Sequence, residues 1–180
     1  MKSSKIAIVC AFLAEGETFI EKFSLKLSEK KPFLIFKGDE ISLIISGMGK
    51  LNSAAATAYL LSKGNFDKAI NAGICASKNA KDLYEVFSVK SVIDYASGKK
   101  YPLKKEGATL TTLDKATFEK PAIKTRLADM EASGFLTAAK KFLPSENIEI
   151  FKVVSDNFEE FPVKKEFVKR LADKLSNFVF

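Results

Sequence analysis

Short apolar runs without polar alternation constrain the fold of this chain most strongly. Residues 5–11 read KIAIVCA, which is rich in β-branched residues and apolar at successive positions. This pattern is typical of a central strand that is buried on both faces of a sheet. Further apolar runs predict strands at 68–72, 85–95 and 148–154, with a weaker one at 108–113.

Segments with helical periodicity lie between the predicted strands. Their apolar residues recur every three or four positions, which places them on one face of a helix. The predicted helices cover 17–27, 51–61, 131–142 and a last segment that begins near Pro162. The alanine-rich segment 51–61 has a narrow apolar stripe, so we expect it to pack on the sheet or at a subunit contact.

A hairpin is predicted early in the chain. Two short strands at 33–36 and 40–46 flank the turn residues Lys37-Gly38-Asp39. Strands that alternate with helices elsewhere indicate an α/β fold. With 180 residues and 47% apolar content, the chain should form one domain over residues 1–180.

Membrane and secretion signals are not expected. No stretch approaches the roughly 20 apolar residues of a membrane span. The apolar run after Lys5 is followed by Glu15 and Glu17 without a convincing cleavage site, so we interpret it as a buried strand. Cys10 and Cys75 are far apart in the sequence, which predicts reduced thiols and a cytoplasmic protein.

The residue inventory also excludes several kinds of site. The chain has no histidine, so we expect no zinc site and no Cys/His nucleophile pair, and we expect neither a metal nor a cofactor. Gly47 and Gly49 lack the third glycine of a dinucleotide-binding fingerprint. The net charge of +7 comes from scattered lysines, so a nucleic-acid partner is not expected.

Acidic residues follow three of the predicted strands. In open α/β sheets, ligands bind beyond the carboxyl ends of the strands, where Glu15, Glu131 and Asp156 stand. Carboxyl groups gathered in a partly desolvated pocket acquire different pKa values, which supplies acid and base catalysis without histidine. The alternative for each acid is a structural role in capping the next helix.

Several segments together resemble one enzyme family. They are the first strand with its acidic loop, SGMGKLNSAA at 46–55, INAG at 70–73, DMEA at 129–132 and VVSD at 153–156. In this order they resemble the methylthioadenosine/adenosylhomocysteine nucleosidases and their nucleoside phosphorylase relatives. The resemblance implies a three-layer α/β/α sandwich with a central mixed, largely parallel sheet, shortened in its middle segment.

The resemblance also implies roles for individual residues in a purine nucleosidase. Asp156 would protonate or hydrogen-bond N7 of the purine, and Ser155 would help to place it. Glu131 would hold the ribose hydroxyls and support the oxocarbenium ion, with Met130 packed against the sugar. Glu15 would orient or deprotonate the attacking water.

Phe12, Gly73 and Ile74 are the remaining substrate-binding candidates, and the last of them departs from the family pattern. Ile74 stands where the family has a hydroxyl residue, and its side chain cannot donate a hydrogen bond to phosphate. The chain is also short between Tyr101 and Asp129, where the family has a helix and part of its base-binding loop. Phe118 is a candidate stacking face for the base.

Three functions remain open at this point. The leading one is hydrolysis of a purine nucleoside, because the absence of histidine removes contacts that some phosphorylases use. The second is phosphorolysis, with Lys50, Lys152 or another cation supplying the positive charge for phosphate. The third is a non-catalytic nucleoside-binding relative. Relatives assemble as dimers or larger oligomers, so we expect a homodimer through 51–61.

Overall fold

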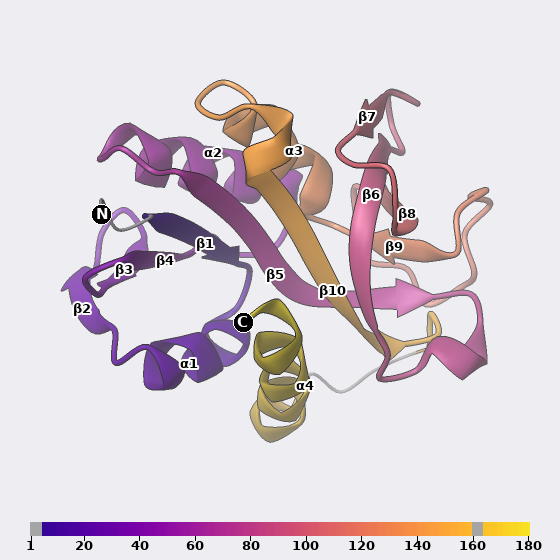
Figure 1. Cartoon of the computed structure of the whole chain (residues 1–180). Helices are drawn as coiled ribbons and strands as arrows, with labels where there is room; N and C mark the ends of the chain where they lie inside the picture. Colours follow the sequence, from indigo (N-terminus) through magenta and orange to yellow (C-terminus); the bar gives the residue numbers. More distant parts are fainter. Residues whose placement is uncertain (1–4, 160–163) are drawn as a thin grey trace.

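Four parallel strands form the centre of the sheet. The structure is a computed structural model that describes residues 5–159 and 164–180 (Figure 1). The order of the central strands is β4 (Ile41–Ile45), β1 (Ile6–Cys10), β5 (Lys68–Ser77) and β10 (Ile148–Asp156). The runs expected as buried strands from the sequence therefore lie at the centre of the sheet.

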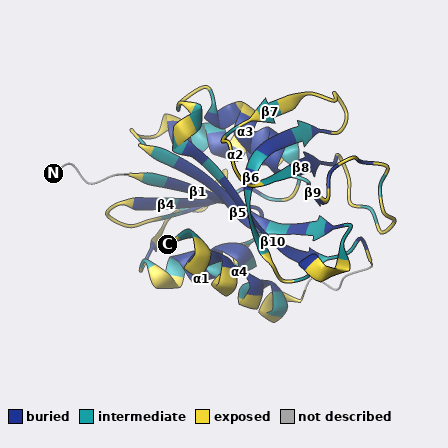
Figure 2. Ribbon diagram, turned by 45° about the vertical axis from the view of Figure 1, so that its right-hand side comes forward, coloured by how far each residue is buried: buried dark blue, intermediate teal, exposed yellow. Residues whose placement is uncertain are grey.

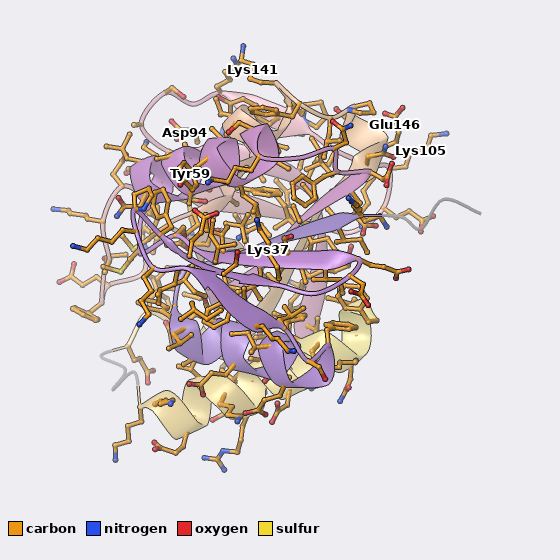
Figure 3. All side chains as sticks on the ribbon, turned by 90° about the vertical axis from the view of Figure 1, so that its left-hand side faces the viewer. Lys37, Tyr59, Asp94, Lys105, Lys141 and Glu146 are labelled. Atoms are coloured by element: carbon orange, nitrogen blue, oxygen red, sulfur yellow. The ribbon has the colours of Figure 1, made fainter. Side chains whose placement is uncertain are left out.

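Antiparallel strands extend the sheet beyond β4. β3 (Leu34–Lys37) pairs with β4, and β2 (Lys26–Glu29) pairs with β3. The hairpin predicted from Lys37-Gly38-Asp39 is thereby confirmed. Glu29 in β2 accepts hydrogen bonds from Tyr59 Oη at 3.0 Å and Lys63 Nζ at 3.1 Å, both from the helix above the hairpin. Figure 3 shows Tyr59 on that helix and Lys37 on the sheet below it.

The other end of the sheet closes into a ring of five strands. β6 (Val86–Asp94) is antiparallel to β10 and parallel to β8 (Ala108–Thr112), which is parallel to β9 (Leu127–Asp129). β9 returns to β5 and completes the ring, while the short β7 (Lys100–Pro102) pairs with β6. The segment between β8 and β9 contains no helix, in agreement with the shortened middle segment.

The ring forms because β5 is longer than the sequence suggested. We expected a strand that ends at Ala72, but residues 73–77 continue the strand. β10 runs along one edge of β5, whereas the other edge pairs with β1 over 68–71 and with β9 at 76–77. Residues 72–75 therefore face a gap between β1 and β9, and a cavity lies beside this gap.

Helices cover both faces of the sheet, which confirms the three-layer sandwich (Figures 1 and 2). α2 (Lys50–Ser62) and α3 (Ala132–Ala139) lie on one face, and α1 (Leu13–Lys22) and α4 (Lys165–Val179) lie on the other. Each face has its own apolar core, as Figure 2 shows by the dark blue buried strands between the helices. None of the helices in the described ranges is long and apolar enough to cross a membrane.

Three helices differ from the prediction, and one of them, α3, ends at Ala139 instead of residue 142. α1 begins at Leu13 and ends at Lys22, because Ser24 adopts a positive φ of 50° and turns the chain into β2. Leu27 therefore belongs to a strand. In α2 the buried side chains are Ser53, Ala56, Thr57, Leu60 and Leu61, so most of the alanine-rich stripe points outward. Pro162 lies outside the described residues.

α2 and α3 cross at very close range. A Cβ atom on Gly134 of α3 would lie 1.9 Å from the backbone oxygen of Lys50, the first residue of α2. Backbone atoms cannot give way as a flexible side chain can. Glycine at position 134 is therefore what allows the two helices to approach.

We predict that Gly134→Ala destabilises the protein by about 3 kcal/mol or more, because the added methyl group forces the two helices apart. The matched control is Gly64→Ala, since a Cβ there meets only Phe66 at 3.7 Å. Urea unfolding of both variants measures the difference. Equal stability of the two variants would contradict the close packing.

Candidate active site

One cavity of about 180 Å³ lies at the carboxyl ends of β5, β9 and β10. The loop after β8 and the loops after β1 and β4 complete its wall. Most of the lining is apolar and includes Ile74, Leu113, Phe118 and Phe158. Among the sequence candidates, the cavity brings together Phe12, Ile74, Met130, Glu131, Ser155 and Asp156. A small apolar cavity with a few polar groups is the usual form of a ligand site.

Asp156 faces this cavity from the last position of β10. Its Oδ2 accepts a hydrogen bond from Ser155 Oγ at 2.7 Å, and its Oδ1 accepts one from Phe158 N at 2.9 Å. Phe158 reaches that position with a φ of 64°, a turn that ends the strand. Both oxygens of Asp156 are thus oriented while the carboxyl group remains partly exposed to the cavity.

Glu131 lines the cavity immediately before α3 and is only 7% exposed. Its Oε1 accepts a hydrogen bond from Gly49 N at 2.9 Å. Gly49 has a φ of 97°, which favours glycine, so the glycine pair noted in the sequence presents an amide to a carboxylate. Burial raises the pKa of Glu131 to about 7; Lys152 opposes this shift and Asp129 adds to it.

Glu15 is buried beside the cavity rather than in its lining. It is 2% exposed, and its Oε2 accepts hydrogen bonds from Ala11 N at 2.8 Å and Phe12 N at 2.9 Å. Its Oε1 accepts one from Ile74 N at 2.9 Å. Burial raises its pKa despite the charge of Lys152. Glu15 thus also caps the amino end of α1, which is the structural role considered above as the alternative to catalysis.

Gly73 makes room for Glu15. A Cβ atom at this position would lie 2.8 Å from Glu15 Oε1, so a larger residue would displace the carboxylate. Gly73 itself does not line the cavity, whereas its neighbour Ile74 does. The amide of Ile74 is free to bind Glu15 because it lies in the gap where neither β1 nor β9 pairs with β5.

Lys152 is the main feature that the sequence reasoning misplaced. It is 1% exposed, and its Nζ lies 2.9 Å from Asp129 Oδ2 and 4.0 Å from Glu131 Oε2. Burial lowers its pKa, but Asp129 and Glu131 outweigh burial, so the pKa is raised and the charge is retained. A lysine inside an otherwise apolar strand was the available signal for this role.

Neither lysine proposed for phosphate lines the cavity. Lys152 is enclosed by carboxylates, and Asp129 is itself held by Thr112 Oγ1 at 2.8 Å and Ala132 N at 2.9 Å. Lys50 contacts Asp94 and Asp114. Both ammonium groups therefore have carboxylate partners within the protein. Phe118, the candidate stacking residue, does line the cavity and is 63% exposed.

Comparison with family models and with curated protein sequences finds no match. Solved structures do match over almost their whole length. The Helicobacter pylori 5′-methylthioadenosine/S-adenosylhomocysteine nucleosidase with butyl-thio-DADMe-Immucillin-A has a TM-score of 0.80 and 16% identity, covering 99% of this chain and 97% of that chain. The Colwellia psychrerythraea nucleosidase in complex with adenine has a TM-score of 0.81 and 17% identity, covering 99% and 93%.

A futalosine hydrolase from Helicobacter pylori is similar to the same extent. Its TM-score is 0.79 at 17% identity, and the match covers 98% of this chain and 95% of that chain. The chain therefore shares its fold with these nucleosidases and with the futalosine hydrolase, as the sequence resemblance implied. At these identities the similarity establishes the fold, and the site residues stay a prediction.

The raised pKa of Glu131 predicts a pH dependence of stability. Between its ordinary pKa of 4.5 and about 7, the folded state binds more protons than the unfolded state, so the free energy of unfolding falls as pH rises. We expect a fall of about 1–3 kcal/mol between pH 5 and pH 8. Urea unfolding at both pH values measures it.

The fall in the free energy of unfolding between pH 5 and pH 8 should be smaller in Glu131→Gln, because glutamine has no carboxyl group to titrate. Glu146→Gln changes an exposed glutamate and should keep the parent slope. An unchanged slope in Glu131→Gln would show that this carboxyl group does not carry the effect.

Proposed function

We propose that the protein hydrolyses the N-glycosidic bond of a purine nucleoside. The observation that carries this proposal is the pair of carboxyl groups, Glu131 and Asp156, on one small apolar cavity. A third carboxyl group, Glu15, is bound to the backbone of two lining residues, Phe12 and Ile74. The fold shared with nucleosidases supports the same reaction.

Asp156 serves the leaving group. Its carboxyl group would hydrogen-bond or protonate N7 of the purine, which stabilises the base as the glycosidic bond lengthens. The hydrogen bonds from Ser155 and Phe158 N fix its orientation before substrate binds. Apolar neighbours such as Phe158 and Leu113 suit the flat faces of a purine base.

Glu131 serves the sugar. Its carboxylate, when ionised, would accept hydrogen bonds from ribose hydroxyls and stabilise the positive charge that develops on the ring. Met130, adjacent in the lining, would pack against the sugar. Water then bonds to C1′ as the bond to the base nitrogen breaks, and the proton that water loses passes to Glu15 in this scheme.

Water is favoured over phosphate as the nucleophile. The side chain of Ile74 offers no donor, and its backbone amide is already bound to Glu15. Lys50 and Lys152 are paired with carboxylates. We therefore propose hydrolysis, with phosphorolysis and ligand binding without turnover as the competing outcomes.

The test is base release from methylthioadenosine, adenosylhomocysteine, adenosine, inosine and futalosine, with and without phosphate. We expect release that does not need phosphate and that falls about 10²- to 10⁴-fold in Asp156→Asn, because the leaving group loses its acid. Asp39→Asn, an exposed aspartate in the hairpin turn, is the matched control and should keep the parent rate.

Three results would contradict this proposal. Strict dependence on phosphate would establish phosphorolysis. Nucleoside binding without turnover would establish a binding protein. Unchanged turnover in Asp156→Asn would remove that residue from the mechanism.

We further propose that the protein is a cytoplasmic homodimer. The free cysteines Cys10 and Cys75 suit a reducing compartment. On the outward face of α2, Leu51 is 81% exposed, and the nearby Met48 is 50% exposed and lines the cavity. A second copy on this face would cover the apolar residues and close the cavity.

We expect Leu51→Glu to convert the dimer into a monomer, because a charge on the buried contact is left unpaired. Sedimentation velocity of the purified variants measures the change. Leu27→Glu is the control, since Leu27 is 45% exposed on the distant β2 edge. A parent protein that sediments as a monomer would contradict the dimer.

A further inference from the structure

Lys50, at the start of α2, forms ion pairs with two aspartates that the proposed reaction does not use. Its Nζ lies 3.0 Å from Asp94 Oδ2 at the end of β6 and also contacts Asp114 Oδ1, in the loop after β8. The backbone of the preceding residue, Gly49, donates to Glu131. The adjacent residues Gly49 and Lys50 therefore contact Glu131, the carboxylate proposed to bind the sugar, and Asp114 in the loop after β8.

Asp94 is a fixed anchor for this lysine. Its Oδ1 accepts hydrogen bonds from Ser97 N at 2.9 Å and Ser97 Oγ at 2.7 Å, and Ser133 Oγ donates to Oδ2 at 3.0 Å. The side chain is nearly buried, and Figure 3 shows it beside α2. Burial acts against ionisation, but these hydrogen bonds and Lys50 prevail and lower the pKa of Asp94 to about 2. The carboxylate is therefore permanently charged near neutral pH.

Asp114 is the more exposed of the two carboxylate partners of Lys50. Its side chain is 44% exposed, and the following residues 115–118 line the cavity. The other hydrogen bonds of residues 114–122 in the described part of the chain are local, between Thr117 and Glu119 and from Ile123 N to Pro121 O. Within the described ranges, the contact with Lys50 is thus the one ion pair or hydrogen bond from 114–122 to another element.

We propose that Lys50 and Asp114 are positioning residues, and that their ion pair holds the loop 115–118 against the cavity so that Phe118 covers the bound base. This inference rests on the proposed function for the identity of the ligand. It does not require the chain to be active, because the pair acts on the loop itself. A partly exposed ion pair shifts a closed-to-open ratio by up to about fivefold.

The chain contains no tryptophan, so Phe118→Trp gives a single fluorescent reporter on the loop. Time-resolved anisotropy measures the fraction of fast local motion of this side chain. We expect that fraction to rise about two- to fivefold when Asp114→Asn is added, since the loop loses its ion pair. Asp114→Glu keeps the charge and should restore most of the parent value.

Glu21→Gln is the matched control in the same reporter background. Glu21 forms a surface ion pair with Lys169 at 2.6 Å, between α1 and α4 on the opposite face of the sheet. This variant should not change the anisotropy. Raising the salt concentration from 0.05 to 0.5 M should loosen the loop in the parent reporter and have less effect in Asp114→Asn.

Turnover provides the second readout. For any nucleoside that the parent chain cleaves, Asp114→Asn should raise KM about two- to fivefold and leave kcat within about a factor of two, because the loop binds the base but does not react. Equal anisotropy in Asp114→Asn and Glu21→Gln would overturn the positioning role. Loop release in a chain that cleaves no nucleoside would instead uphold this role and refute the proposed function.

Discussion

The site depends on the ion pairs that the buried ammonium group of Lys152 forms with carboxylates. This group lies on the central strand β10, 2.9 Å from Asp129 and 4.0 Å from Glu131, and its charge also acts on Glu15. Three carboxyl groups from different elements thus share one cation in a water-poor interior. Burial disfavours the ionised forms of Glu131 and Glu15 and raises the pKa of both carboxyl groups, while the charge of Lys152 limits that rise.

Backbone amides donate hydrogen bonds to the carboxyl oxygens of Glu15 and Glu131 that Lys152 does not reach. Glu15 accepts three of them, and Glu131 accepts one from Gly49 at 2.9 Å and a longer one from Met130 at 3.4 Å. These donors are available because the chain leaves regular pairing at particular places: the turn before α2, the start of α1 and the gap beside β5. Buried carboxylates without such donors would be far more costly. The fold and the carboxylate cluster therefore require each other, and Gly73 and Gly49 are the residues at which the backbone permits both.

Much of the fold was predictable from local pattern, and the parts that were not have long-range causes. The strand around Ile8, the hairpin and the grouping of Glu131 with Asp156 follow from apolar runs and from the rule that strand ends meet at one edge. The continuation of β5 past Ala72 depends on β9, a three-residue strand with little signal of its own. Lys152 was misplaced for a similar reason, because its partners come from two distant segments, one with Asp129 and Glu131 and one with Glu15.

The charge around the cavity gives a physical reason why water suits this site better than phosphate. The lining residues include the acids Asp129, Glu131, Asp156 and Glu159, with Lys115 as the one lysine among them in the described part of the chain. An incoming phosphate dianion would meet this negative potential with Lys115 as the one lining lysine to offset it in the described part of the chain, whereas a neutral water molecule would not be repelled. The same potential attracts the positive charge that develops on a sugar ring as its base departs. In the proposed reaction, this charge would stabilise the transition state of glycosidic cleavage, and a carboxylate would activate the nucleophile.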